Sequence, residues 1–167
     1  MRCILLRHGI AVEWHDWDGE DRTRPLTEEG IEKTTKVAKG LHQLDVRPTH
    51  ILCSPFLRTQ QTAKIAQDIL GISEDAQLSP ELLSEASPEH FVKFLGSFSR
   101  DATLLCVGHE PHLGSTAGVM VCGQPTPGMS MKKAGACSIY FEGRPRAGAG
   151  VLEWWLPPAH LRQLGRG

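Results

Sequence analysis

The sequence has almost no excess charge: 18 Lys and Arg stand against 19 Asp and Glu, and the pI is about 6.7. This balance gives no support for nucleic acid or an acidic membrane as the main partner. No apolar run is long enough to span a bilayer. No basic segment followed by an apolar one opens the sequence, so we expect no signal peptide. We therefore expect a cytoplasmic protein without nucleic-acid or membrane partners.

The sequence does not indicate a disulfide framework, because the five cysteines are odd in number and scattered. Cys3, Cys53 and Cys106 each lie inside an apolar, strand-like run, which is typical of reduced, buried thiols. The sequence contains no internal repeat and no long linker. Its 167 residues fit one domain of ordinary size. We assign residues 1–158 to that domain and residues 159–167 to a loose C-terminal tail.

Short apolar runs alternate with helical patterns along the chain. The expected strands are residues 3–6, 50–53, 103–107, 137–141 and 151–156, with a weaker one at 76–78. The expected helices follow Thr27, Ser54, Ser87 and Glu110. This alternation predicts an α/β fold, a three-layer α/β/α sandwich whose central sheet is mainly parallel. The last two strands are candidates for an antiparallel pair.

Helix start and stop signals refine these expectations. Thr27 is suited to cap the first helix, with two glutamates in the first turn. Ser54 is expected to cap the second helix, with Pro55 at its first position. Gly71 is expected to end that helix.

Cationic and imidazole side chains follow three of the predicted strands directly. Arg7 and His8 follow the first strand, Ser54 follows the second with Arg58 one turn further on, and His109 follows the strand at 103–107. Ligands of open α/β sheets bind beyond the carboxyl ends of the strands. Arginine holds phosphate through a planar fork of donors, and helix N-termini attract anions. The pattern therefore predicts a phosphoryl-binding site.

Within this site, His8 is the candidate nucleophile, because a neutral ring nitrogen is available near pH 7. Gly9 is expected to allow an unusual backbone angle or the close approach of a ligand. Arg24 lies in the loop of residues 12–26 that faces the site. It either anchors the substrate or ties the loop to a carboxylate, and the sequence does not distinguish the two roles.

Three segments together resemble the histidine phosphatase superfamily, also called the phosphoglycerate mutase-like family. They are LLRHG at residues 5–9, SPFLRTQQTA at 54–63 and VGHEP at 107–111. The short chain, the RPLTEEG segment at 24–30 and the lack of a large insertion after the second segment are most similar to the short bacterial phosphohistidine phosphatases of the SixA type.

This resemblance implies a phosphoglycerate mutase-like fold and a catalytic role for four residues. His8 would be phosphorylated transiently, Arg7, Arg58 and His109 would hold the phosphoryl oxygens, and water would hydrolyse the phosphohistidine. His109 would best be protonated to offset the phosphate charge, while His8 must be neutral. The resemblance implies no metal and no organic cofactor. Its expected substrate is a phosphohistidine-containing protein.

Many superfamily members protonate the leaving oxygen with a carboxylic acid that follows the second helix. Glu81 and Glu85 lie in the matching segment here, and Glu85 is the better placed of the two. SixA-type enzymes lack this acid, because a phosphoramidate leaving group carries a basic nitrogen. Glu85 is therefore either a proton donor for phosphate esters or a solvated loop charge.

Other functions remain open on the sequence alone. A small-molecule phosphate ester phosphatase or a phosphoglycerate mutase-like enzyme would use the same fold. A cysteine phosphatase would pair Cys53 with Arg58, although the spacing is one residue short and the loop lacks glycine. A phosphate-binding module without catalysis would have no need for His8. Trp14 and Trp17 either line the entrance or anchor the loop, and Lys132 and Lys133 are either solvated or face an acidic partner.

Overall fold

A six-stranded mixed sheet, in the order β3-β2-β4-β1-β5-β6, forms the centre of the molecule. The computed structural model describes residues 1–166. Four strands run parallel, namely β1 (Arg2–Arg7), β2 (His50–Cys53), β3 (Gln77–Leu78) and β4 (Thr103–Gly108). The last two, β5 (Ala136–Tyr140) and β6 (Val151–Leu156), are antiparallel to their neighbours. The predicted, mainly parallel sheet with an antiparallel final pair is confirmed.

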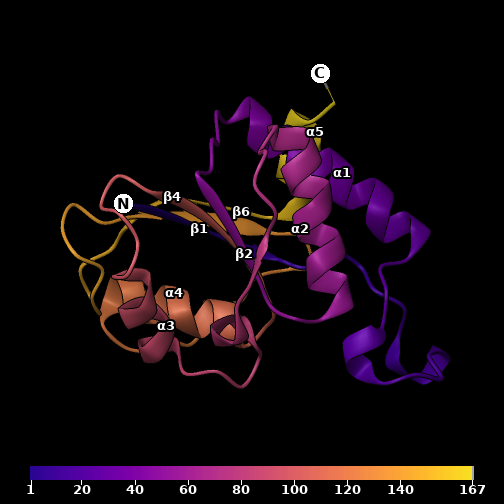
Figure 1. Cartoon of the computed structure of the whole chain (residues 1–167), viewed down its shortest axis with the longest axis horizontal. Helices are drawn as coiled ribbons and strands as arrows, with labels where there is room; N and C mark the ends of the chain where they lie inside the picture. The colour runs from indigo at the N-terminus through magenta and orange to yellow at the C-terminus, as the bar shows by residue number, and fades with distance from the viewer. Residues whose placement is uncertain (167) are drawn as a thin grey trace.

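Helices cover both faces of this sheet (Figure 1). Helices α1 (Glu28–Gln43), α2 (Leu57–Leu70) and α5 (Pro158–Leu164) pack on one face. Helices α3 (Pro88–Leu95) and α4 (His112–Cys122) pack together on the other face. The predicted α/β/α sandwich is therefore confirmed.

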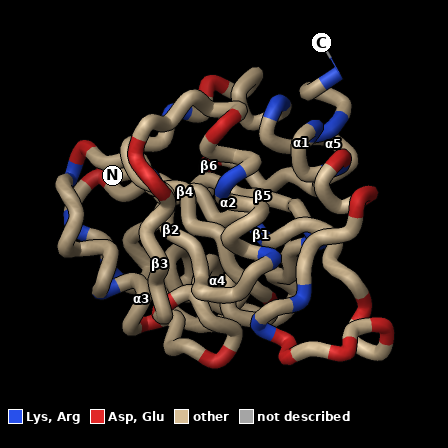
Figure 2. The backbone as a smooth tube through the Cα atoms, turned by 45° about the vertical axis from the view of Figure 1, so that its right-hand side comes forward, with Lys and Arg blue, Asp and Glu red and all other residues tan. Residues whose placement is uncertain are grey.

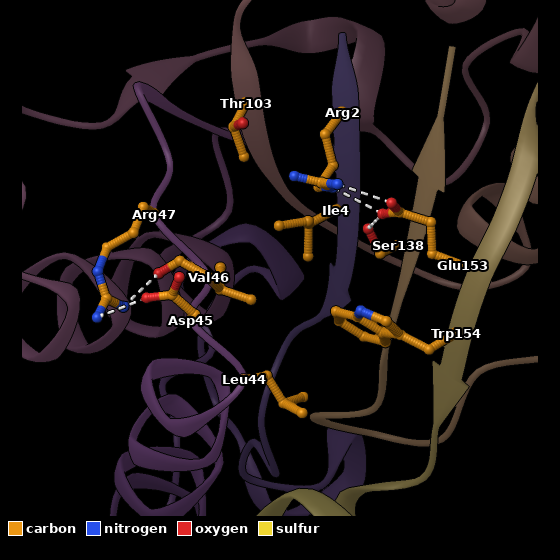
Figure 3. A pocket seen from close by; sticks show the side chains of 10 residues that line it. All are labelled: Arg2, Ile4, Leu44, Asp45, Val46, Arg47, Thr103, Ser138, Glu153 and Trp154. Atoms are coloured by element: carbon orange, nitrogen blue, oxygen red, sulfur yellow. Dashed lines mark hydrogen bonds and ion pairs between the residues drawn. The ribbon is translucent and has the colours of Figure 1, made fainter. Parts of the chain in front are cut away.

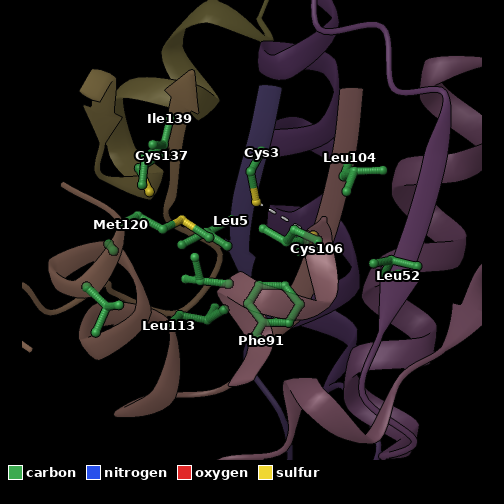
Figure 4. Close-up of a cluster of buried hydrophobic side chains, with 14 of the residues drawn as sticks. Cys3, Leu5, Leu52, Phe91, Leu104, Cys106, Leu113, Met120, Cys137 and Ile139 are labelled. Carbon is green, nitrogen blue, oxygen red and sulfur yellow. Dashed lines mark hydrogen bonds between the residues drawn. The ribbon is translucent and has the colours of Figure 1, made fainter. Parts of the chain in front are cut away.

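The alternation of side chains along β1 divides the core into two clusters. Ile4 and Leu6 are buried against α1, α2 and α5, whereas Cys3 and Leu5 are buried against α3 and α4. Figure 4 shows the second cluster, in which the thiols of Cys3 and Cys106 lie 3.9 Å apart on neighbouring strands. Because both faces of β1 are covered, the strand is continuously apolar from Cys3 to Leu6, between Arg2 and Arg7 at its two ends.

The first helix begins as the sequence predicts, and the second does not. The Thr27 hydroxyl accepts a hydrogen bond from the Gly30 N–H at 2.9 Å and caps α1. Helix α2 begins at Leu57 after Phe56, not at Pro55, so the predicted Ser54 cap is wrong. The Ser54 hydroxyl bonds to other side chains instead, as described below. Helix α2 ends at Gly71, whose φ of 70° is left-handed, as predicted.

The expected loose tail is also wrong, because residues 158–164 form helix α5 against α1. Leu161 is fully buried in the cluster under α1. The contact is close enough that a Cβ atom on Gly40 of α1 would overlap the backbone carbonyl of Leu161. Glycine is thus required at this crossing of two helices.

The loop of residues 12–26 folds back beside the sheet edge. It contains two short 3-10 turns, Trp14–Asp16 and Asp21–Thr23. An antiparallel bridge between Ala11 and Leu26 closes the base of the loop. This closure brings the second turn next to the first turn of α2.

Charged residues of both signs are spread over the backbone (Figure 2). Within residues 1–166, no helix has the length and apolar character needed to cross a membrane.

We predict that Gly40→Ala lowers the free energy of unfolding by about 1–3 kcal/mol, because the added methyl must push α5 away from α1. This loss outweighs the gain of about 1 kcal/mol in helix propensity. Urea unfolding measures the difference. Gly143→Ala is the control, because a Cβ there meets nothing within 4 Å. Equal stability of the Gly40→Ala variant and the parent would show that α5 contributes nothing through this contact.

Candidate active site

Three strand ends meet at one edge of the sheet. Arg7 of β1 pairs with Gly108 of β4, and the His8 N–H donates to the Gly108 carbonyl at 3.1 Å. The Ser54 N–H donates to the Val107 carbonyl, also at 3.1 Å. The residues that follow these strands are therefore fixed side by side. The ring centroids of His8 and His109 lie 5.2 Å apart.

The His8 ring is buried and held in one tautomer. Its Nδ1 lies 2.7 Å from the Gly9 carbonyl oxygen, which can only accept a hydrogen bond. Nδ1 therefore carries the proton, and Nε2 carries a free lone pair. Burial, with smaller contributions from His109, Arg58 and Arg7, lowers the pKa of His8 to about 3. The ring is thus neutral at pH 7 and has the lone pair that a nucleophile needs.

Gly9 serves packing rather than an unusual backbone angle. Its φ is not left-handed, and a Cβ there would overlap the Thr34 hydroxyl of α1. Its N–H donates to the Thr62 hydroxyl at 3.0 Å. The predicted unusual backbone angle at Gly9 is therefore wrong, and the structure shows a close approach of α1 and α2 to the segment that carries His8. The close approach of a ligand stays a prediction.

His109 is held by Ser54 and Phe56. Its Nε2 lies 2.6 Å from the Ser54 hydroxyl, and the Phe56 ring meets it edge-on at 5.0 Å between centroids. Burial, followed by the charge of Arg58, lowers the pKa of His109 to about 4. The ring is therefore neutral at pH 7 without a bound anion, and the protonated His109 expected beside a phosphate stays a prediction. A bound phosphoryl dianion would favour the protonated form again.

Arg58 is buried in the first turn of α2. Its guanidinium lies 4.8 Å from the centre of the Phe56 ring. Its Nη1 donates to the backbone carbonyl of Asp21 at 2.8 Å, and its Nη2 donates to the Asp21 carboxylate at 3.1 Å. The 3-10 turn of the loop thus supplies the counter-charge of a buried arginine.

The same carboxylate holds Arg24. The Nε of Arg24 donates to Asp21 at 2.9 Å, and its Nη1 donates to the Val12 carbonyl at 2.6 Å. Of the two roles left open for Arg24, the structure favours tying the loop to a carboxylate. Asp21 consequently bridges Arg24 and Arg58.

Arg7 is positioned through a chain of hydrogen bonds. Its Nη1 donates to the Met131 carbonyl at 2.7 Å, and the Met131 N–H donates to the Glu110 carboxylate at 3.1 Å. Glu110 also accepts from the Gly114 N–H in α4 at 3.1 Å. Within residues 1–166, the Nε atoms of Arg7 and Arg58 are buried and have no hydrogen-bond partner. Each of these two guanidinium groups therefore has one N–H donor that no protein atom within this range satisfies.

Glu85 is exposed and accepts a hydrogen bond from the Ser84 hydroxyl at 2.8 Å. Its negative charge acts to raise the pKa of His109 and thus slightly favours protonation of that ring. Glu81, the other candidate, accepts from Ser79 at 2.8 Å. Neither carboxylate is hydrogen-bonded to His8 or His109 within the described chain.

The remaining residues singled out in the sequence lie on the surface of the loops. Trp14 is 61% exposed, whereas Trp17 is partly buried and donates to the Glu20 carbonyl at 3.3 Å. Lys133 pairs with Glu13 at 3.2 Å, and Lys132 is exposed. Trp17 thus anchors the loop, and Trp14 is free to contact other molecules.

Comparison with known proteins agrees with this geometry. The family model for the histidine phosphatase superfamily (branch 1) matches residues 3–85. An uncharacterized protein of Picosynechococcus is 37% identical over 141 residues, which are 83% of this chain and 84% of that protein. The chain belongs to the histidine phosphatase superfamily.

Similarity within this superfamily extends over the whole chain. The phosphohistidine phosphatase SixA of Escherichia coli is 28% identical over 165 residues, with 97% of each chain covered. A structure of the protein histidine phosphatase SixA complexed with tungstate matches with a TM-score of 0.84 at 26% identity, over 96% of this chain and 99% of that one. This chain is thus a superfamily phosphatase with SixA as a homologue.

The structure does not support Cys53 as the nucleophile of a cysteine phosphatase. Cys53 is buried in the cluster under α1, and burial raises its pKa to about 11. The thiol therefore stays protonated at neutral pH and is a poor nucleophile.

Across residues 1–166, no three His, Cys, Asp or Glu side chains come together as a metal site would require.

Sequence analysis missed Asp21, Glu110 and Phe56. Asp21 could have been found from its spacing, because it lies three residues before Arg24 in the loop. Glu110 follows His109 in the VGHEP segment, and its hydrogen bond to the distant Met131 leaves no signal in the local sequence. Nothing in the local sequence marks Phe56 as a neighbour of both Arg58 and His109.

We predict that the free energy of unfolding falls as the pH is lowered from 7 to 5.5. His8, His109 and His112 are buried, and burial lowers their pKa values to about 3, 4 and 4. The unfolded chain, with histidine pKa values near 6.5, therefore binds more protons than the folded chain over this range. Each histidine contributes a slope of up to about 1.4 kcal/mol per pH unit.

Urea unfolding at several pH values measures this slope. His112→Gln should reduce it by up to one histidine's share, because His112 lies outside the phosphoryl site and is buried edge-on against Phe91. His15→Gln should not change it, because the His15 side chain is 77% exposed. A parent protein with the same stability at pH 7 and pH 5.5 would contradict the burial of neutral histidines.

Proposed function

We propose that this superfamily phosphatase transfers the phosphoryl group of its substrate to Nε2 of His8. The observation that carries the proposal is the neutral, tautomer-locked His8 ring next to His109, Arg7 and Arg58. In the first step the Nε2–P bond forms and the bond from phosphorus to the leaving atom breaks. In the second step water attacks phosphorus, the Nε2–P bond breaks, and inorganic phosphate leaves. His8 returns to its neutral form.

The arginines stabilise the charge that spreads over the phosphoryl oxygens during both steps. Arg7 is the last residue of β1, and Arg58 lies in the first turn of α2. The carbonyl groups of Met131 and Asp21 each accept a hydrogen bond from one guanidinium and hold Arg7 and Arg58 in place before the substrate binds. His109, restrained by Ser54, completes the cage and gains a proton as the phosphoryl group binds.

We further propose a phosphohistidine side chain of a protein as the substrate. The leaving nitrogen of a phosphoramidate is basic and needs less help from a dedicated acid than an alkoxide does. The exposed Glu85 and the lack of a carboxylate on either site histidine within residues 1–166 support this choice. Similarity to SixA over 97% of the chain supports it independently. The partner would be a phosphohistidine-containing protein.

We predict that His8→Ala lowers turnover by at least about 1000-fold, because no other side chain can take over the covalent step. The measurement uses a phosphohistidine protein with a radiolabelled phosphoryl group. Rapid quenching in alkali should trap label on the parent enzyme and none on the variant. His15→Ala serves as the control, because His15 is exposed on the loop. Normal turnover without His8, or a parent enzyme that never carries label, would refute the covalent step.

We predict that Glu85→Gln changes the hydrolysis of a phosphohistidine protein by less than about threefold, because the leaving nitrogen accepts a proton from water readily. The same variant should hydrolyse an alkyl phosphate ester as slowly as the parent does, since the exposed carboxylate does not act on the leaving oxygen.

The outcome distinguishes the phosphohistidine phosphatase from an ester phosphatase on the same fold. The charge of Glu85 reaches His109, and this observation favours the ester phosphatase as the second candidate. A parent enzyme that prefers alkyl esters and loses about tenfold or more of that activity in Glu85→Gln would assign the acid role to Glu85. It would also replace the proposed substrate by a small phosphate ester.

A further inference from the structure

A cavity lies at the opposite end of β1 and β4 from His8 and His109. It has a volume of about 460 Å³ and is lined at one end by Arg2 and Thr103, the first residues of β1 and β4. Ile4 of β1 also lines it, and His8 lies four residues further along the chain, a distance of about 13 Å. Its volume lies within the range of small-molecule sites. The proposed phosphatase mechanism uses none of its residues.

The floor of the cavity is a row of three paired residues across β1, β5 and β6. Ile4 pairs with Ser138, and Ser138 pairs with Trp154. Ile4 and Ser138 are fully buried, whereas the Trp154 ring is partly exposed. On the facing wall, the loop after α1 contributes the apolar side chains of Leu44 and Val46 (Figure 3).

A β-bulge shapes the opposite wall. Ser138 pairs with Trp154 and Ile139 pairs with Leu152, so Glu153 is the extra residue of β6. The bulge brings the consecutive side chains of Glu153 and Trp154 to the same cavity (Figure 3). Bulges re-aim side chains in this way and are frequent beside functional sites.

The charges around the cavity cancel in pairs. Arg2 donates to Glu153 from Nε and Nη2, both at 2.7 Å, and the Ser138 hydroxyl donates to the same carboxylate at 2.6 Å. Arg47 pairs with Asp45 at 2.9 Å on the other wall. Each acid is already neutralised by an arginine, so the cavity favours an uncharged ligand over an ionic one.

Two donors remain available to that ligand. Within residues 1–166, neither Nη1 of Arg2 nor the indole N–H of Trp154 has a hydrogen-bond partner. The free end of Arg2 and the ring of Trp154 both point into the space between the two walls (Figure 3). An indole face stacks on flat aromatic rings, and the two N–H groups require acceptor atoms.

We propose that this cavity binds a small, uncharged, planar heteroaromatic molecule of the nucleobase or nucleoside type. Its ring lies against the Trp154 indole, and its ring nitrogens or carbonyl oxygens accept hydrogen bonds from Arg2. The proposal is independent of the proposed function, because the cavity and the phosphoryl site share no residue.

The test titrates the full, isotope-labelled chain with adenosine and guanosine while NMR follows the four tryptophan indole N–H signals. Adenine and guanine, as free bases, show whether the ribose is needed. We expect a saturable shift of the Trp154 signal, assigned from Trp154→Phe, with a Kd on the order of 0.1 mM. Ribose, which lacks the ring, and benzoate, which is an aromatic anion, should bind at least about tenfold more weakly.

Matched variants locate the site. Arg2→Lys keeps a positive charge for Glu153 but removes the free guanidinium nitrogen, and it should weaken binding by roughly five- to tenfold. Trp154→Phe should weaken binding less, because a ring remains; this variant and Arg2→Lys are each checked by thermal unfolding. Trp14→Phe is the control, because Trp14 lies on the loop near the phosphoryl site. Excess inorganic phosphate should not displace the nucleoside.

Four results would overturn the proposal. They are no saturable shift with any of the bases and nucleosides, binding unchanged in Arg2→Lys, displacement by inorganic phosphate, and benzoate or ribose binding as tightly as adenosine. Each of these measures binding directly and does not depend on phosphatase activity.

Discussion

The pairing of β1 with β4 is the constraint on which the phosphoryl site depends. Because Arg7 lies opposite Gly108, the residues that follow the two strands emerge next to each other. Their rings are then 5.2 Å apart, although the two histidines are separated by a hundred residues of sequence. A shift of this register by one residue would turn the side chain of His8 to the opposite face of the sheet and separate it from His109. The site is thus a direct product of strand register.

Burial gives the two histidines their chemistry. The Gly9 carbonyl fixes the proton on Nδ1 of His8, and the buried, positively charged surroundings keep a second proton away. The neighbouring arginines disfavour the protonated form of His8, and their positive charge attracts an anionic phosphoryl group to the neutral ring. The cations Arg7 and Arg58, which add to the effect of burial on the His8 pKa, would also stabilise the phosphoryl group in the proposed reaction.

The sequence predicted those parts of the site that follow buried strands, because apolar runs and their ends are local features. His8, Ser54 and His109 are of this kind. It did not predict the pKa of His109, which depends on burial by residues from several elements. It also missed helix α5, because that helix is anchored mainly by Leu161, and one buried leucine between prolines and polar residues gives no periodic pattern.

Asp21 shows why loop partners escape sequence analysis and how they act. A buried arginine requires a counter-charge, and the loop supplies it through the carboxylate and carbonyl of one residue. A phosphoryl group that binds Arg58 must share or displace that carboxylate. The loss of the Asp21 contact is then offset by a more highly charged anion on the same donors. Asp21 also accepts from Arg24, whose Nη1 donates to the Val12 carbonyl, so Arg24 would hold the carboxylate near Arg58 if it were displaced. Under the proposed function, the contribution of Arg58 to substrate binding is therefore the difference between its interaction with the phosphoryl group and its interaction with Asp21.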